Sequence, residues 1–336
     1  MRLTKTVGVQ VDLGAETGSG TAGMRGAVER YVGSAIVIGI LALAFALPAI
    51  TGLSVQGLAA KILIFGLVAM SLDLLVGYLG LWSFCHATLV GAAAYSTAIL
   101  ISRFGITDFW ITAPASLLAA GLLACLLAYI SLRVSGLYYL LVTLALGQAF
   151  YYTTIIWVSL FGGSDGIGRI KYPSIAHSDV SYYYFVLLVC LACFILLHLI
   201  TKSPFGYVLR GIRDNETRMK CLGYNVWLYK FTAFVVAGLF AAAAGILYVH
   251  FNGLITPASV GVEANGLPWL FLIIGGAATL WGALTGSALI LILQYFVSSV
   301  IPQRWPIVLG ACFIVAVMLA RSGIFVAIRK LLNGKR

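Results

Sequence analysis

Charged residues are scarce in this sequence. Only 9% of its 336 residues are Asp, Glu, Lys or Arg, and just 10 of these are acidic. Soluble domains carry about 25% charged and about 45 to 50% apolar residues, whereas 62% of this chain is hydrophobic and its mean hydropathy is +1.04. A water-soluble globule could not bury that much apolar surface. The composition therefore excludes a soluble protein and predicts an integral membrane protein.

The motifs of several enzyme classes are also absent. No GxxxxGK[ST] phosphate-binding loop occurs, so we expect the energy for any work to come from a partner or an ion gradient. Paired carboxylates, a Ser/His dyad and a metal-ligand cluster are missing. The CxxC at Cys190 and Cys193 has no second pair and no nearby His, which favours inert packing. We expect no catalytic residue, no metal site and no cofactor bound by this chain.

Long apolar runs, by contrast, are abundant. A helix needs ~20 apolar residues to cross a bilayer, and the runs predict one all-α polytopic domain with about ten transmembrane segments over residues 34–325. A Gly-rich segment precedes it at residues 1–33, predicted to be flexible, cytoplasmic and uncleaved, and a basic cytoplasmic tail follows at 326–336. The predicted segments lie near residues 34–51, 57–77, 81–101, 109–132, 136–161, 181–200, 228–250, 266–280, 282–300 and 305–320.

The basic residues indicate the orientation of the chain. If the N-terminus is cytoplasmic and the segments alternate, 16 of the 21 Lys and Arg residues fall on the cytoplasmic side. This asymmetry is typical of membrane proteins, so it predicts that both termini are cytoplasmic. It also accounts for the net charge of +11 without a nucleic-acid partner. The exceptions are Lys61, Arg103, Arg169, Lys171 and Arg304.

One long polar stretch, "SPFGYVLRGIRDNETRMKCLGYNVWLYKF" at residues 203–231, interrupts the apolar sequence. Ser203 is a good N-cap, Pro204 suits the first helical position and Gly223 suits a left-handed C-cap, so the stretch predicts one helix of about five turns over 204–223. Its apolar residues recur at helical spacing: Val208, Leu209, Ile212, Met219 and Leu222. We expect this helix to dock a soluble cytoplasmic protein. The alternatives are a topology anchor or a helix lying on anionic membrane lipid.

Three polar residues inside the spans are candidates for the translocation path, because such groups are expensive in a bilayer. Asp73 could instead bond another helix or pair with Lys61 or His86. His86 lies in a Gly-flanked, Ser-rich segment that predicts a broken helix, although a packing role is the alternative. Gln148 could equally bond between helices.

Small residues gather near the end of the sequence. Glycines at short spacing let two helices approach closely, so we expect them to serve packing, with a hinge as the second possibility. These glycines are Gly275, Gly276, Gly282 and Gly286.

Five ordered motifs resemble the permease family of branched-chain amino-acid ABC transporters, of the LivM type. They cover about residues 56–325 and are the polar stretch itself, "GYLGLWSFCHA" at 77–87, "GLYYLLVTLALG" at 136–147, "GGSDGI" at 162–167 and "GGAATLWGALTG" at 275–286. The sequence departs from the family pattern at several positions: Ala278 and Cys85 replace glycines, Gln148 replaces an acidic residue, and Arg321, Ser322 and Gly323 replace an "RPxG" ending.

The resemblance implies an assembly in the bacterial inner membrane. This subunit and a LivH-like second permease would form the membrane part. Two cytoplasmic ATPases would bind ATP and Mg, and a periplasmic binding protein would deliver substrate. The loop 202–230 would couple the permease to one ATPase through Arg210, Arg213, Asp214, Glu216, Gly223 and Lys230.

The cargo implied by the resemblance is a branched-chain or related amino acid. Related permeases carry urea, short amides or small organic and aromatic acids, so a different cargo stays open. A stand-alone secondary transporter or channel is a further alternative. It would need ion-coupling carboxylates and inverted repeats, and only Asp73 fits that pattern.

Overall fold

The computed structural model describes residues 52–170, 172–173 and 178–300, together with seven isolated positions: 45, 48, 307, 308, 310, 311 and 314. The chain divides into two units, residues 1–52 and 53–336, and nearly all described residues belong to the second. Apart from those isolated positions, the predicted segments 34–51 and 305–320 lie outside the described residues. So do the segment 1–33, the tail 326–336 and the departure at residues 321–323.

The second unit is built from apolar helices, as the composition predicted. In the described part of the chain, seven helices are long and apolar enough to cross a membrane, which makes the chain a multi-pass membrane protein. They are α2 (Leu53–Asp73, continued by the π-helix η1, Leu74–Leu79), α3 (His86–Phe104), α4 (Phe109–Ser131), α5 (Leu137–Ile156), α7 (Asp179–Lys202), α10 (Val226–Asn252) and α12 (Leu280–Val300).

An eighth apolar helix is shorter. Helix α11 (Val262–Gly275) has 14 residues, roughly 21 Å, which is less than the ~30 Å of a hydrocarbon core. The predicted segment 266–280 is therefore a partial crossing rather than a full span. The described residues thus hold eight of the ten predicted segments, and the total of ten stays a prediction.

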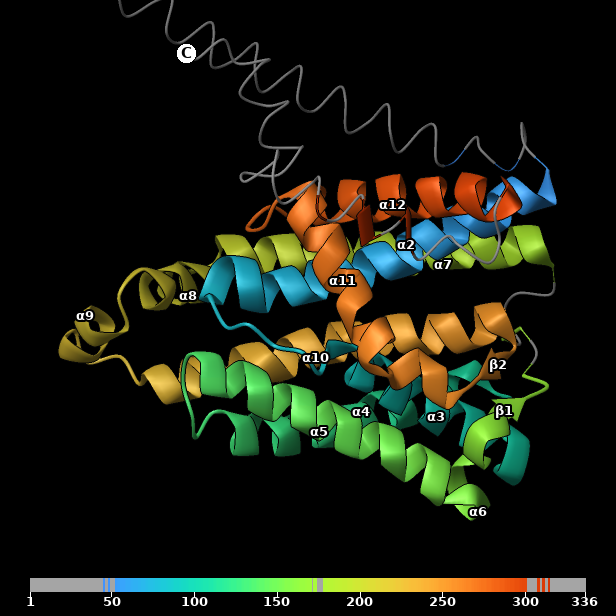
Figure 1. Ribbon diagram of the computed structural model, residues 1–336, viewed down its shortest axis with the longest axis horizontal. Coiled ribbons are helices and arrows are strands. Elements are labelled where there is room, and N and C mark those ends of the chain that lie inside the picture. Colours follow the sequence, from blue (N-terminus) through green and yellow to red (C-terminus); the bar gives the residue numbers. More distant parts are fainter. Residues whose placement is uncertain are drawn as a thin grey trace, which may run out of the picture. The chain divides into compact units, whose positions relative to one another are not determined.

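Helices α2 and α10 form the centre of the bundle. α10 packs against α3, α4 and α2, while α2 also packs against α7, α11 and α12 (Figure 1). The most apolar stretch of α2 is 78% buried, whereas that of α5 is only 22% buried. Exposed leucines such as Leu118, Leu137 and Leu188 cover the outer helices. An apolar exterior of this kind suits lipid or another membrane subunit.

The two ends of the bundle carry different connections. Helices α8 (Pro204–Asp214) and α9 (Glu216–Cys221) lie at one end, called here the α8–α9 end (Figure 1). The opposite end carries the short helical turns α6 (Val158–Phe161), η2 (Gly163–Asp165) and η3 (Pro257–Val260). A two-residue antiparallel ladder also lies there, between β1 (Ile167–Gly168) and β2 (Leu254–Ile255), with Ile167 opposite Ile255. This ladder is the one departure from an all-α fold among the described residues.

The placement of the basic loops agrees with the alternating scheme. Arg133, in the turn between α4 and α5, lies at the same end as residues 212–230. Arg169 follows β1 at the opposite end. Which end faces the cytoplasm stays a prediction.

The segment between α2 and α3 differs from its predicted form. We predicted a span at 81–101, but residues 80–85 are not helical and α3 begins only at His86. Gly80 adopts a left-handed conformation, which ends the preceding helix. The segment then runs back into the bundle before α3 starts (Figure 1). The broken helix predicted around His86 is therefore present.

Candidate functional site

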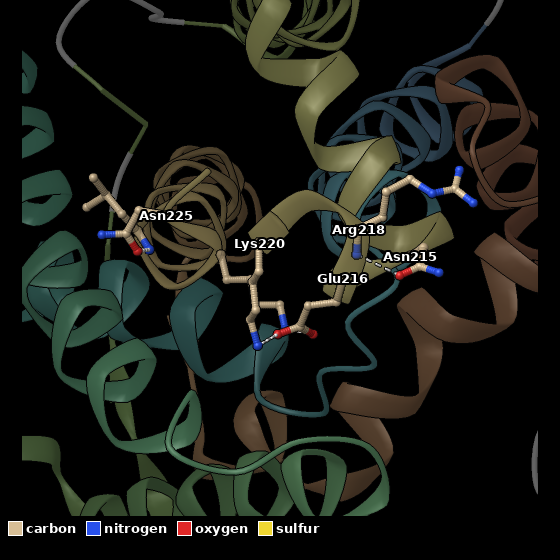
Figure 2. Close-up of polar contacts among 7 residues, drawn as sticks. Asn215, Glu216, Arg218, Lys220 and Asn225 are labelled. Atoms are coloured by element: carbon tan, nitrogen blue, oxygen red, sulfur yellow. Dashed lines mark hydrogen bonds and ion pairs between the residues drawn. The ribbon is translucent and has the colours of Figure 1, made fainter. Parts of the chain in front are cut away.

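The polar stretch forms two helices rather than the single five-turn helix we predicted. Asn215 separates them with an extended backbone (φ −161°, ψ 101°), and its side chain accepts a hydrogen bond from the Arg218 amide at 2.9 Å (Figure 2). Asparagine is a strong N-cap because its side chain replaces a missing backbone acceptor. That local bond ends α8 and starts α9.

The predicted ends of the stretch are confirmed. The Ser203 hydroxyl accepts from the Gly206 amide at 3.4 Å, and Pro204 occupies the first turn of α8. At the far end Gly223 has φ +86°. Its amide donates to the Lys220 carbonyl at 3.0 Å, and the Tyr224 amide donates to Met219 at 3.2 Å. This pair of bonds is a Schellman motif, which favours glycine at the left-handed position.

The apolar face of the stretch packs against the bundle. Val208, Leu209, Ile212 and Met219, four of the five apolar residues at helical spacing, are buried. Leu222 is different, because 65% of its surface is exposed. The sequence prediction places Leu222 on the apolar face by assuming one continuous helix. The break at Asn215 gives α9 a different direction, so Leu222 does not lie on the buried face.

Glu216 joins α9 to α10. Its carboxylate lies 2.9 Å from Lys220 Nζ in the same helix and 2.6 Å from Lys230 Nζ in α10. Burial raises the pKa of Glu216, but the hydrogen bonds and charges of both lysines outweigh it and hold the pKa below its ordinary value. Figure 2 shows Lys220 reaching this carboxylate while the Arg218 guanidinium points away from it.

The arginines of α8 turn back toward the bundle. Arg213 donates to the main-chain carbonyl of Gly77 in η1. Arg210 donates to the Thr201 carbonyl at 3.3 Å, and its guanidinium lies over the ring of Tyr78 at 5.0 Å. Of the residues proposed for coupling, these two attach α8 to the end of α2. Asp214 is exposed at the end of α8.

A groove of about 560 Å³ lies beside these helices. It separates α8 and α9 from the turn between α4 and α5 and from the segment after η1. Its lining includes Leu79–Leu81, Leu132–Gly136, Ile212–Glu216, Lys220, Val226, Trp227 and Lys230.

Asp73 bonds to the turn between α11 and α12, rather than to another helix, Lys61 or His86. The carboxylate is fully buried, and its Oδ1 accepts a hydrogen bond from the Ala278 amide at 2.7 Å. Ala278 lies just before α12, so the carboxylate faces the positive end of that helix. Gly77 packs against both groups, because a Cβ there would overlap Asp73 Oδ1 and the Ala278 main chain.

His86 lies in a buried polar cluster at the start of α3. Its Nε2 is 2.8 Å from Ser71 Oγ in α2. The next amide, from Ala87, donates to Asn265 Oδ1 of α11 at 2.8 Å. Gly147 of α5 packs on the same cluster, with Thr88 and Asn265 as near neighbours. Gln148, the next residue of α5, is only half-buried.

The non-helical segment is held by side chains that sequence analysis missed. The Phe84 amide donates to Thr143 Oγ1 at 3.0 Å, and Trp269 Nε1 donates to the Ser83 carbonyl at 3.0 Å. The Trp269 ring also stacks on Phe84 at 5.2 Å. Asn265 carried one signal that could have found it, since it is an amide inside an otherwise apolar helix.

The four glycines near the end of the sequence lie where α11 turns into α12. Gly275 faces the Gly282 carbonyl so closely that a Cβ would overlap it, and Gly286 faces the Phe271 carbonyl in the same way. Gly276 occupies the turn with φ +102°. The two helices therefore meet backbone to backbone.

The comparisons with known proteins agree with this architecture. The LivM high-affinity branched-chain amino acid transport permease of Escherichia coli K12 is 24% identical over 284 residues, covering 76% of this chain and 66% of that protein. A probable LivM permease of Methanocaldococcus jannaschii is 25% identical over 273 residues, covering 70% and 79%. LivH of Escherichia coli K12 is 22% identical over 275 residues, covering 76% and 88%. This chain thus spans just under two thirds of the length of the Escherichia coli LivM.

No solved structure gives a significant match to the chain. The family described as "Branched-chain amino acid transport system / permease component" matches residues 54–320. That range includes every full-length span of the described structure apart from the first residue of α2, as well as α8, α9 and α11. The chain belongs to the branched-chain amino acid transport permease family.

Proposed function

We propose that this chain is a membrane-spanning permease subunit of an ATP-driven ABC importer. The α8–α9 pair carries the proposal. It lies at one end of the bundle, buries an apolar face against the spans, and leaves Asp214, Arg218 and Leu222 exposed. An exposed leucine beside charged groups suits a protein interface better than a lipid-facing anchor.

Membership of the family supports the rest of the proposed assembly. The partners are a LivH-like second permease, two cytoplasmic ATPases carrying ATP and Mg, and a periplasmic binding protein. The names of the relatives support a branched-chain or related amino acid as cargo. The location is the bacterial inner membrane, with the α8–α9 end in the cytoplasm.

The contacts of α8 suggest how an ATPase would drive the spans. A push on α8 reaches the end of α2 through the bond from Arg213 to Gly77 and the contact of the Arg210 guanidinium with the Tyr78 ring. Asp73 then connects α2 to the start of α12. Movement of the α8–α9 pair is therefore transmitted to α2 and α12.

Co-purification from native membranes tests this function. Two ATPases and a second permease should accompany the tagged chain, and Arg218→Glu with Leu222→Asp should remove the ATPases. Both side chains are exposed, so the fold should tolerate these changes. Arg103→Glu, an exposed charge reversal at the opposite end of the bundle, is the matched control and should retain every partner.

The opposite result would favour another class. A chain that purifies alone and transports in liposomes without ATP would contradict the importer and favour a secondary transporter.

A further inference from the structure

Helix α3 begins inside the bundle rather than at its end. His86 starts the helix beside Ser71 of α2, which precedes Leu79, the last residue of η1, by eight positions, roughly 12 Å along the helix axis. Figure 1 shows the non-helical segment leading inward to this point. A helix N-terminus therefore lies within the span.

The first turns of α3 and α11 meet there. The Ala87 amide donates to Asn265 Oδ1 at 2.8 Å, while Asn265 Nδ2 donates to the carbonyls of Val260 at 3.3 Å and Gly261 at 3.1 Å. The first amides of a helix lack acceptors within the helix and carry partial positive charge. Two such N-termini at one point favour an anionic group.

Two polar atoms in this turn are buried without a hydrogen-bond partner in the described structure. They are His86 Nδ1 and Thr88 Oγ1, in residues that are 1% and 0% exposed. Unpartnered buried polar groups destabilise a fold and are uncommon. Here two of them lie in one helical turn, at a helix N-terminus.

The hydrogen bonds determine what each atom offers a ligand. The Ser71 hydroxyl donates its hydrogen to the Val68 carbonyl at 2.7 Å, so it accepts from Nε2–H of His86. In the neutral ring, Nδ1 is then an acceptor. The Thr88 hydroxyl, in contrast, has a hydrogen to donate.

We propose that the first turn of α3 is the substrate-binding site of the permease and recognises a free α-amino acid. This inference rests on the proposed function. The carboxylate binds the first amides of α3, in the place that Asn265 Oδ1 occupies here, and accepts a hydrogen bond from Thr88. The ammonium donates to His86 Nδ1. Gly147 lets α5 approach this turn closely, since a Cβ there would lie 3.2 Å from Thr88 Oγ1 and 3.7 Å from Asn265 Nδ2.

Binding to the purified complex tests the site separately from transport. The probes are L-leucine and L-tyrosine, each compared with its amide, which lacks the carboxylate. Thermal shift and tryptophan fluorescence report binding, because Trp269 contacts the segment before α3. The free amino acid should bind at least tenfold more tightly than its amide.

Two threonines of α3 form a matched pair. Thr88→Val removes a hydroxyl without a partner, so stability should be kept while amino-acid affinity falls about tenfold. Thr97→Val removes a hydroxyl that donates to Ala93 at 2.9 Å and to Ser116 at 2.8 Å. It should lower stability and leave affinity unchanged.

Two substitutions of His86 form a crossed pair. In His86→Gln, the amide nitrogen of Gln can take the position of Nε2 and donate to Ser71 Oγ. The acceptor at the position of Nδ1 is lost, so affinity should fall about tenfold. In His86→Asn, the amide oxygen of Asn can take the position of Nδ1 as an acceptor, but the bond to Ser71 is lost. This variant should therefore lose stability and retain most of the affinity.

Specific outcomes overturn the site. A wild-type complex that binds none of the probes, or Thr88→Val and His86→Gln complexes that bind like the wild type, would overturn it even if ATP drives uptake. A complex that binds with the expected pattern but imports nothing with ATP supports the site and contradicts the importer.

Discussion

Arg213 of α8 donates a hydrogen bond to the main-chain carbonyl of Gly77, which lies 136 residues earlier in the chain. Gly77 belongs to the π-helix that ends the α2 span. A π-helix displaces carbonyls from the regular hydrogen-bond ladder and often occurs at functional sites. The bond therefore attaches the predicted coupling helix to the one stretch of α2 whose backbone departs from α-helical geometry.

Arg213→Ala should weaken the attachment of α8 to α2 while keeping Asp214, Arg218 and Leu222 on the exposed surface of the α8–α9 pair. We expect the ATPases to co-purify as before, transport to fall at least tenfold, and the free energy of unfolding to fall by about 1–2 kcal/mol. Thermal unfolding and ATP-driven uptake measure the two effects. Arg218→Ala, whose guanidinium points away from the Glu216 pairs, should leave stability unchanged. Normal transport by the Arg213 variant would contradict a role for this bond in coupling.

Gly77→Ala should be among the most damaging substitutions in the chain. A Cβ at this position overlaps Asp73 Oδ1 and the main chain of Ala278. We therefore expect the free energy of unfolding to fall by about 3 kcal/mol, or the protein to fail to fold. Yield and thermal unfolding in detergent measure this. Gly266 provides the control, because a Cβ there meets nothing within 4 Å. Gly266→Ala in α11 should be neutral or slightly stabilising.

Much of the local structure was predictable because local rules determine it. Ser203 and Gly223 mark the ends of the polar stretch, and both cap as their residue types indicate. The break before His86 was also predicted, from the glycines and serines around it. Asn215 was missed because the apolar spacing continues across it, and a single side-chain bond outweighed that periodicity.

The direction of side chains was less predictable. Arg210 and Arg213 have the sequence pattern of an exposed polar face, yet both contact the end of α2, 120 or more residues away in the sequence. Asn265 and Thr143 hold the broken segment from two other helices. Such contacts depend on how spans pack, which one sequence does not specify.

Ala278→Gly should stabilise the protein. Ala278 has φ +64°, a left-handed conformation that is unfavourable for any residue with a Cβ. The family motif that this stretch resembles has glycine at this position. We expect the free energy of unfolding to rise by about 0.5–1 kcal/mol. This net gain already includes the cost of the greater flexibility of glycine in the unfolded chain. Thermal unfolding measures this gain. Ala277→Gly is the control: Ala277 does not have a positive φ, so this substitution should be neutral or destabilising.

Acidification should loosen the contact between α9 and α10. Lys230 and Lys220 hold the pKa of Glu216 below its ordinary value, so the folded state binds a proton less readily than the unfolded state. The stabilisation is therefore complete above the ordinary glutamate pKa of about 4.3 and is lost as the pH falls through the lower pKa of the folded protein. Thermal unfolding of the wild type and of Glu216→Gln between about pH 6 and about pH 3 measures this. The two curves should converge at low pH, because protonation removes the same charge as the substitution. A constant difference across that range would show that the ion pairs with Lys220 and Lys230 do not stabilise the α8–α9 end.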